Sequence, residues 1–255
     1  MDDYKVIFNS NNLGEVEGVW LYYYNATDLP DRDTNIHKLA RRSLSIVTSA
    51  EYTQKTIPVM MRVCSGSRQA TEDTITRIKG LLQPQNGELI VYQSGEDFKY
   101  TATMNEFNIE WVGTSAYVVI VFIASTPIAE AVDTDIMTNF NTTLASDGSS
   151  FIVNGSYIAE PIINVTINSV TGGSGSSVSI FNASTNQGIT VTGNFTAGSQ
   201  LEIDCSQYTV RLNGVNMDFE GLFPTFPPGS QRIGYSDTFT TRDVDVTVTY
   251  NKQVV

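Results

Sequence analysis

Short runs of alternating hydrophobic and polar residues extend over most of the chain, and this period of two predicts β-strands. Clusters of Gly, Asn and Ser separate the runs, as turns do. The strands predicted in the first half are Tyr4–Phe8, Val16–Tyr24, Lys38–Val47, Thr56–Val63, Gly87–Tyr92, Tyr100–Asn105, Phe107–Val112 and Ala116–Ala124. The fold class is therefore mainly β.

One segment, Ala70–Leu82, has a helical period instead. Its apolar residues fall on one face of a helix: Ile75, Ile78, Leu81 and Leu82. Thr71 is the predicted N-cap, because Glu72 and Asp73 follow it where the helix dipole favours negative charge. Pro84 prevents the helix from continuing. One helix with these strands predicts an α+β domain.

The composition changes after residue 125, where polar Asn, Thr, Ser and Gly residues accumulate. We therefore expect an N-terminal domain over residues 1–130, a linker over 131–150 and a second domain over 151–255. Even spacing of short strands predicts a β-sandwich for the second domain. Its predicted strands are Ile162–Ile167, Ser177–Asn182, Gly188–Val191, Gln200–Asp204, Thr209–Leu212 and Val244–Tyr250.

Three features point to contacts beyond a single chain. Tyr117–Ala124 is apolar without alternation, which predicts a central strand or a strand at a subunit contact. Pro58 suggests an edge strand or the start of a strand, since proline cannot donate to a ladder. Residues 161–201 contain no charged side chain. That stretch fits either a closed sandwich with a polar outer face or a surface covered by a partner.

The charge balance excludes a nucleic-acid reader. Fifteen basic residues stand against 27 acidic ones, for a net charge of −12. Residues 1–130 carry 11 basic and 16 acidic residues, net −5, and residues 131–255 carry 4 and 11, net −7. No signal peptide or membrane-spanning run is evident, so synthesis in the cytosol and no membrane insertion are expected. Cys64 and Cys205 could form a disulfide, but two free thiols are the preferred interpretation.

Motifs of catalysis are missing, and we predict no enzyme activity and no catalytic, cofactor-binding or metal-binding residue. The single histidine, His37, lies in a polar, basic segment and is interpreted as a surface residue. Two carboxylate pairs, Glu202 with Asp204 and Asp243 with Asp245, could each form an acid pair or a calcium site. No further oxygen ligands accompany them, and Asp204 is interpreted as a turn residue.

Two other clusters have both a functional and a structural interpretation. The aromatic run Trp20–Tyr24 could stack on a sugar, but packing in a sheet or across a subunit contact is preferred. The basic stretch Lys38–Arg42 is expected to pair with acids at an interface rather than to bind DNA, because the whole chain is acidic.

The order of these pieces resembles the distal tail protein (Dit) family of siphophages. In the first half the resemblance rests on the strand at Ile57–Val59, the turn at Gly66–Ser67, the helix, the Gln83–Pro84 break and the strand Glu88–Tyr92. In the second half the matching segments are Gly188–Ile189, Leu201–Asp204, Val210–Gly214, Leu222–Pro224, Pro228–Gly229 and Val244–Tyr250. Together, these segments extend the resemblance over nearly the whole chain.

The resemblance implies an N-terminal belt domain that closes into a homohexameric ring and a C-terminal galectin-like β-sandwich. Such a ring joins the tail tube protein to the tail-tip hub protein, and DNA passes through its lumen without specific binding. Receptor-binding proteins are possible further partners, and the expected location is the distal end of the phage tail, after assembly in the host cytoplasm.

Two rival functions stay open at this point. The first is a carbohydrate-binding, lectin-like protein acting through the sandwich, which requires a solvent-facing aromatic residue such as Phe181 or Phe195. The second is a glycoside hydrolase acting through one of the two carboxylate pairs.

Overall fold

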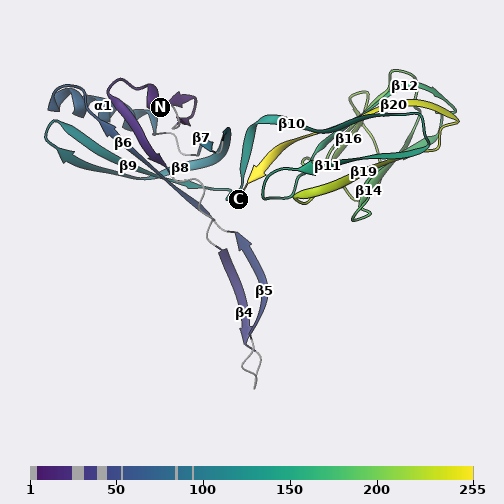
Figure 1. Ribbon diagram of the computed structural model, residues 1–255, viewed down its shortest axis with the longest axis horizontal. Helices are drawn as coiled ribbons and strands as arrows, with labels where there is room; N and C mark the ends of the chain where they lie inside the picture. Colours follow the sequence, from purple (N-terminus) through teal and green to yellow (C-terminus); the bar gives the residue numbers. More distant parts are fainter. Residues whose placement is uncertain are drawn as a thin grey trace. The chain divides into compact units, whose positions relative to one another are not determined.

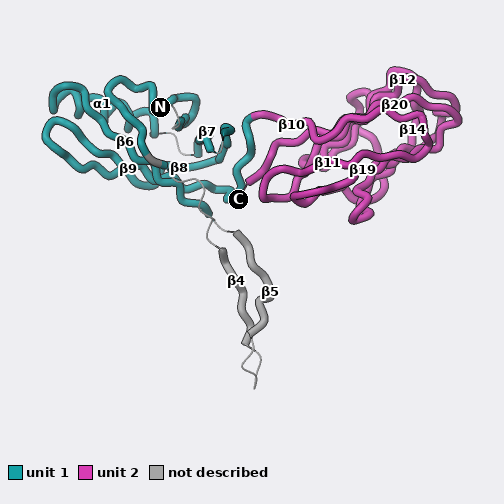
Figure 2. Tube along the Cα trace, in the orientation of Figure 1, with its two compact units in different colours: residues 1–132, 255 teal, residues 133–254 magenta. Residues whose placement is uncertain are grey.

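The computed structural model describes residues 5–24, 32–38, 45–52, 54–83, 86–93 and 95–254. The chain divides into two compact units, residues 1–132 with 255 and residues 133–254 (Figure 2). Strands β4 (Arg32–Lys38) and β5 (Ser45–Tyr52) form a separate antiparallel pair, of which the structure describes the backbone. The side chains of His37 and Lys38 and the whole of residues 39–42 lie outside the described part.

Apart from the β4–β5 pair, the described residues of unit 1 form an antiparallel sheet and one α-helix (Figure 1). Its strand order is β3-β6-β9-β8-β7-β1-β2. The strands are β1 (Val6–Phe8), β2 (Asn11–Asn12), β3 (Val19–Tyr24), β6 (Lys55–Val63), β7 (Gly87–Gln93), β8 (Glu96–Val112) and β9 (Ser115–Ala124). A short 3-10 helix, η1, covers Leu13–Glu15.

The long strand β8 connects the two halves of this sheet. Its first part pairs with β7, and its second part pairs with β9. The sequence pattern predicted two strands here, broken near Asn105. The chain is instead continuous, and the register shifts between Met104 and Glu106, as at a β-bulge. A bulge reverses the inside–outside alternation, which is why the pattern looked interrupted.

Helix α1 (Arg68–Leu81) begins earlier than predicted. Its N-cap is Ser67, whose hydroxyl accepts a hydrogen bond from the Ala70 amide at 3.2 Å. Thr71 is not the cap. It lies in the first turn, fully buried, and its hydroxyl is 2.9 Å from the carbonyl oxygen of Thr114. The predicted apolar face is confirmed at Ile75 and Ile78, which are buried, together with Leu82 just beyond the helix.

Strand β6 is a central strand, so the edge position expected from Pro58 is wrong. It pairs with β3 on one side and with β9 on the other. Pro58 lies opposite Val121 on β9, and the described part of β3 reaches only to the neighbouring pair, Tyr24 with Val59. The proline therefore stands next to the last described pair of the β3–β6 ladder.

Unit 2 consists of two antiparallel sheets. The first has the order β17-β16-β15-β12-β20-β10, and the second has the order β11-β19-β13-β14-β18. The strands of the first are β10 (Ala129–Thr142, which begins in unit 1), β12 (Ile162–Thr171), β15 (Gln200–Asp204), β16 (Thr209–Leu212), β17 (Val215–Asn216) and β20 (Thr241–Val254). Those of the second are β11 (Ser146–Val153), β13 (Ser176–Asn182), β14 (Gly188–Gly193), β18 (Glu220–Gly221) and β19 (Gly229–Asp237).

The segment expected as a linker, residues 131–150, is instead mostly strand. It forms much of β10 and the first part of β11. Its polar composition reflects exposure, because most of the β10 side chains after residue 131 face solvent. A polar segment can still form a strand if its backbone N–H and C=O groups find hydrogen-bonding partners. Strand β19 provides these partners along the whole of β11.

A single hydrophobic core lies between the sheets of unit 2. The first sheet contributes Ile163, Val165 and Val246 to it, and the second contributes Ile180 and Tyr235. The uncharged run 161–201 thus alternates between buried apolar residues and outward Ser, Thr and Asn. The closed-sandwich interpretation of that run accounts for these positions.

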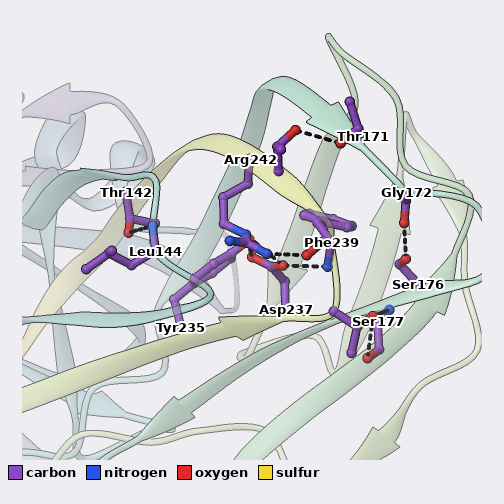
Figure 3. Close-up of polar contacts among 12 residues, drawn as sticks. Thr142, Leu144, Thr171, Gly172, Ser176, Ser177, Tyr235, Asp237, Phe239 and Arg242 are labelled. Atoms are coloured by element: carbon purple, nitrogen blue, oxygen red, sulfur yellow. Dashed lines mark hydrogen bonds and ion pairs between the residues drawn. The ribbon is translucent and has the colours of Figure 1, made fainter.

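A buried polar network holds the corner between β19 and β20 (Figure 3). The Asp237 side chain is fully buried, and the Arg242 Nε is 2.9 Å from its Oδ2. Asp237 also accepts hydrogen bonds from the Tyr235 hydroxyl at 2.8 Å and the Phe239 amide at 2.7 Å. The Arg242 guanidinium donates to the Phe239 carbonyl. Every member is satisfied, as a buried charge requires.

Candidate assembly surface

The strands β3, β6, β9 and β8 present one covered face and one open face. Helix α1 lies over the covered face, beside β6 and β9 (Figure 1). Arg68 of the helix stacks 4.3 Å from the Trp111 ring centroid, and Lys79 lies 5.1 Å from that of Phe107. The opposite side carries the side chains that alternate with the buried ones, and we call it the open face.

The strand register places the members of the open face beside one another. Tyr117 on β9 is paired with Arg62 on β6, which in turn is paired with Trp20 on β3. Val119 is paired with Met60 in the same way. Met60, Arg62, Tyr117 and Val119 occupy alternate positions of β6 and β9, whose other residues are buried, so their orientation follows from the two-residue period. Trp20 shares their face as the partner of Arg62.

Large aromatic side chains are exposed on the open face. Trp20 is 55% exposed and Tyr22 is 40% exposed. The Tyr22 and Tyr117 rings meet edge to face, with centroids 6.2 Å apart and an interplanar angle of 87°. Contiguous exposed apolar and aromatic side chains of this kind mark sites of protein association. The subunit contact expected for Trp20–Tyr24 stays a prediction, for which Trp20 and Tyr22 are accessible on this face.

The open face is hollowed in two places. One hollow of about 470 Å³ is lined by Trp20, Tyr22, Arg62, Cys64 and Tyr117. A second of about 420 Å³ includes Met60, Asn108, Glu110 and Val119, and shares Tyr22 and Tyr117 with the first. The tyrosines thus form a ridge between two depressions that could receive side chains of a partner. Burial, with Tyr117 and Glu110 nearby, raises the pKa of Tyr22, so this ridge carries a neutral hydroxyl at neutral pH.

Both cysteines are free thiols, as the preferred interpretation held. Cys64 follows β6 at the rim of the first hollow. Hydrogen bonds involving Ser115 and the Gly66 backbone lower the pKa of the Cys64 thiol below its ordinary value. Cys205 is buried in the core of unit 2, and burial raises the pKa of its thiol to about 12. The two thiols should therefore differ sharply in reactivity.

Alkylation of the native chain with iodoacetamide at neutral pH is expected to modify Cys64 and to spare Cys205. The reason is that the reactive species is the thiolate, which Cys64 forms more readily and exposes to solvent. Intact-mass and peptide mass spectrometry would measure it, with Cys64→Ser as the control that should take no label. Labelling of Cys205 at an equal rate in the folded chain would contradict this.

The first carboxylate pair, Glu202 with Asp204, has structural partners. Glu202 forms an ion pair with Arg211 on the neighbouring strand at 3.0 Å. Asp204 accepts hydrogen bonds from the backbone amides of Ser206 and Gln207, each at 3.0 Å. The predicted turn role of Asp204 is confirmed.

The second pair, Asp243 with Asp245, lies on β20 between two asparagines. Asn141 donates to both carboxylates at 2.7 and 2.9 Å, and Asn168 donates to Asp245 at 2.8 Å. The bonds from Asn168 and Asn141 lower the pKa of Asp245. The lowered pKa makes Asp245 unsuited to be the proton-donating acid of a glycosidase, and the asparagine bonds give the pair a structural role.

The aromatic residues required for a sugar-binding face are not freely presented. Phe195 is buried in the core of unit 2, where its ring meets that of Phe239 at 5.4 Å. Phe181 is on the outer side of its sheet and is half-buried, and its ring lies directly over Gly234 on the adjacent strand. A Cβ added at Gly234 would come within 2.3 Å of that ring. The Phe181 ring thus packs on Gly234 and is not freely exposed for stacking on a sugar.

Within the described ranges, no cluster of three or more His, Cys, Asp or Glu side chains is placed to hold a metal ion. The same part of the chain contains no helix long and apolar enough to span a membrane.

Comparison with known proteins agrees with the architecture. A family model, the siphovirus-type tail component C-terminal domain (SPP1 Dit), matches residues 154–253. The C-terminal unit belongs to the Dit family of siphovirus-type tail components. The resemblance to the Dit family that the sequence indicates is confirmed over this part of the chain.

The fold of the whole chain is similar to that of the SPP1 Dit protein. The crystal structure of that protein superposes with a TM-score of 0.71 at 11% identity, over 99% of this chain and 99% of the other. A chain of the phage p2 baseplate in its activated conformation with calcium covers 96% of this chain at 9% identity, with a TM-score of 0.45. Comparison with curated proteins found no match.

Proposed function

We propose that this Dit-family chain is the distal tail adaptor: a homohexameric ring that joins the tail tube protein to the tail-tip hub protein. The main observation behind this proposal is the open face of unit 1, where Trp20, Tyr22 and Tyr117 surround two hollows. The Dit-like fold over the full chain length, in a tail component, supports the same assignment.

A cyclic assembly explains why the apolar surface is on one side of one sheet. In a ring, each subunit presents one patch to the next subunit and receives it on a different surface, and the rotation closes the ring. Such a contact requires a rigid patch of aromatic residues with depressions that accept the neighbour. The open face has both, on strands locked from behind by a buried core.

The charge of the chain suits a channel for DNA. The net charge of −5 over residues 1–130 would repel phosphates, so DNA would slide through the lumen of the ring without binding. We propose that unit 1 lines this lumen, and that the galectin-like sandwich of unit 2 is available to other tail proteins, including receptor-binding proteins. A lumen lined mainly by Lys and Arg would overturn the repulsion argument.

Light scattering of the purified chain tests the ring directly. The expected mass is six times 28.0 kDa, about 168 kDa, or twice that for two stacked rings. Negative-stain images should show an open centre. A dimer, or open filaments at all concentrations, would contradict the proposal. So would a monomer, if tails assembled from the same chain also showed no six-fold ring at the distal end.

A further inference from the structure

Unit 2 carries a second exposed aromatic cluster, far along the chain from the open face. Its members are Tyr208, Phe219 and Phe223, which we call the aromatic triad. The Phe223 ring meets Tyr208 at 5.4 Å and Phe219 at 5.0 Å, both edge to face. Tyr208 is 62% exposed and Phe219 is 39% exposed. Phe223 anchors the triad, because its other side packs against the core of unit 2.

The backbone at Tyr208 is unfavourable for a tyrosine. Its φ of +54° is in the left-handed region, where a residue with a side chain other than Asn or Gly costs about 1–2 kcal/mol. Tyr208 ends the turn between β15 and β16, a position for which glycine or asparagine is the ordinary choice. The ring itself is mostly exposed, so burial offsets little of this cost. Because the backbone strain at Tyr208 is not offset by burial of its ring, we interpret the exposed ring as functional.

Two acidic residues are neighbours of the triad in the sequence. Asp218 and Glu220 flank Phe219, and both are exposed. In the part of the chain that the structure describes, neither of them forms an ion pair. An exposed segment that carries both aromatic rings and carboxylates is suited to a basic partner segment, whose cations gain cation–π attraction from the rings and Coulomb attraction from the acids.

A second copy of unit 2 is poorly suited to supply that cation. Residues 131–255 contain four basic residues. Two of these are already committed, Arg211 to Glu202 and Arg242 to the buried Asp237. A chain of net charge −12 would also repel its own acidic surface.

We infer that the aromatic triad, with Asp218 and Glu220, is a docking site for a basic segment of a different tail protein, one that presents Arg or Lys beside apolar side chains. This goes beyond the adaptor ring and does not depend on it: it requires only that the chain be a tail component. Leu222, 67% exposed, adds an apolar contact next to the triad in sequence.

Photo-crosslinking in assembled tails tests the site. Benzoylphenylalanine is incorporated in place of Leu222, and the tails are irradiated and analysed by peptide mass spectrometry. The expected product is an adduct with a peptide of another tail protein that contains Lys or Arg. A second position, Ile152, which is 67% exposed on β11, at the opposite edge of the sheet from β18, should not crosslink to that peptide. An adduct with a second copy of this chain, an adduct with a peptide lacking basic residues, or no adduct would overturn the inference.

Substitutions separate the docking role from a structural one. Tyr208→Asn relieves the backbone strain, so the thermal stability of the chain should stay the same or rise. The adduct yield should nevertheless fall about tenfold, as should the yield with Asp218→Asn and Glu220→Gln together. A Tyr208→Asn chain that crosslinks as well as the original would show that the ring has no part in docking. Because ring formation is read from mass, failure here leaves the adaptor proposal standing.

Discussion

Replacing Asp237 by alanine is expected to lower the free energy of unfolding of unit 2 by about 3–5 kcal/mol. The substitution leaves the nearly buried guanidinium of Arg242 without its carboxylate and removes the acceptor of the Tyr235 hydroxyl and the Phe239 amide (Figure 3). For a unit of this size the midpoint of thermal unfolding should fall by more than about 10 °C. Calorimetry or circular dichroism of the purified chain measures it.

The matched control is the exposed ion pair of Glu202 with Arg211, whose side chains are 42% and 45% exposed. Glu202→Ala should cost less than about 1 kcal/mol, because solvent screens that pair. Arg242→Met in addition to Asp237→Ala should recover part of the loss, since no buried charge then lacks a partner. Equal effects of Asp237→Ala and Glu202→Ala would show that the corner network does not hold unit 2 together.

Trp20→Ser is expected to prevent assembly of the proposed ring while leaving each subunit folded. Trp20 is 55% exposed on the open face, so its removal should change subunit stability by less than about 1 kcal/mol. At a subunit contact, loss of a central tryptophan commonly costs 2 kcal/mol or more, and a closed ring repeats that cost at every contact. Light scattering should therefore show a monomer where the original chain forms the larger species.

Ile152→Ser provides the control for this experiment. Ile152 is similarly apolar and exposed, but it lies on β11 of unit 2. Its replacement should leave the mass of the assembly unchanged. If Trp20→Ser leaves a hexamer of undiminished stability against dilution, the open face is not the contact between subunits. Circular dichroism of both variants confirms that any loss of assembly does not come from unfolding.

Local sequence patterns predicted helices and strands well wherever one face of the element is buried. The helix over Arg68–Leu81 followed from Ile75 and Ile78, whose spacing can bury them only on a helix. Strands β9 and β13 followed from apolar residues that the core requires. Strand β19 (Gly229–Asp237) was missed, because it contains two glycines and mostly polar residues, with Ile233 and Tyr235 as its only large apolar side chains.

Predictions failed where pairing with distant strands decides the outcome. Residues 131–150 looked like a linker, yet the ladder between β11 and β19 makes part of them a strand, with Gly148 opposite Gly234. Pro58 suggested an edge, yet β3 and β9 flank its strand on both sides. Backbone pairing depends on which strands meet, and short-range composition contains little of that information.

The sequence by itself determined the mainly β class, the helix near residues 70–82, the acidic charge that disfavours nucleic-acid reading, and the resemblance to the Dit family. These depend on residue type and local order, which read directly from the chain. Only the tertiary structure decided that Trp20, Arg62 and Tyr117 share one open face, that Asp237 and Arg242 form a buried pair, and that Tyr208 meets Phe223. Those contacts join residues from separate strands and turns, and they exist only once the sheets have formed.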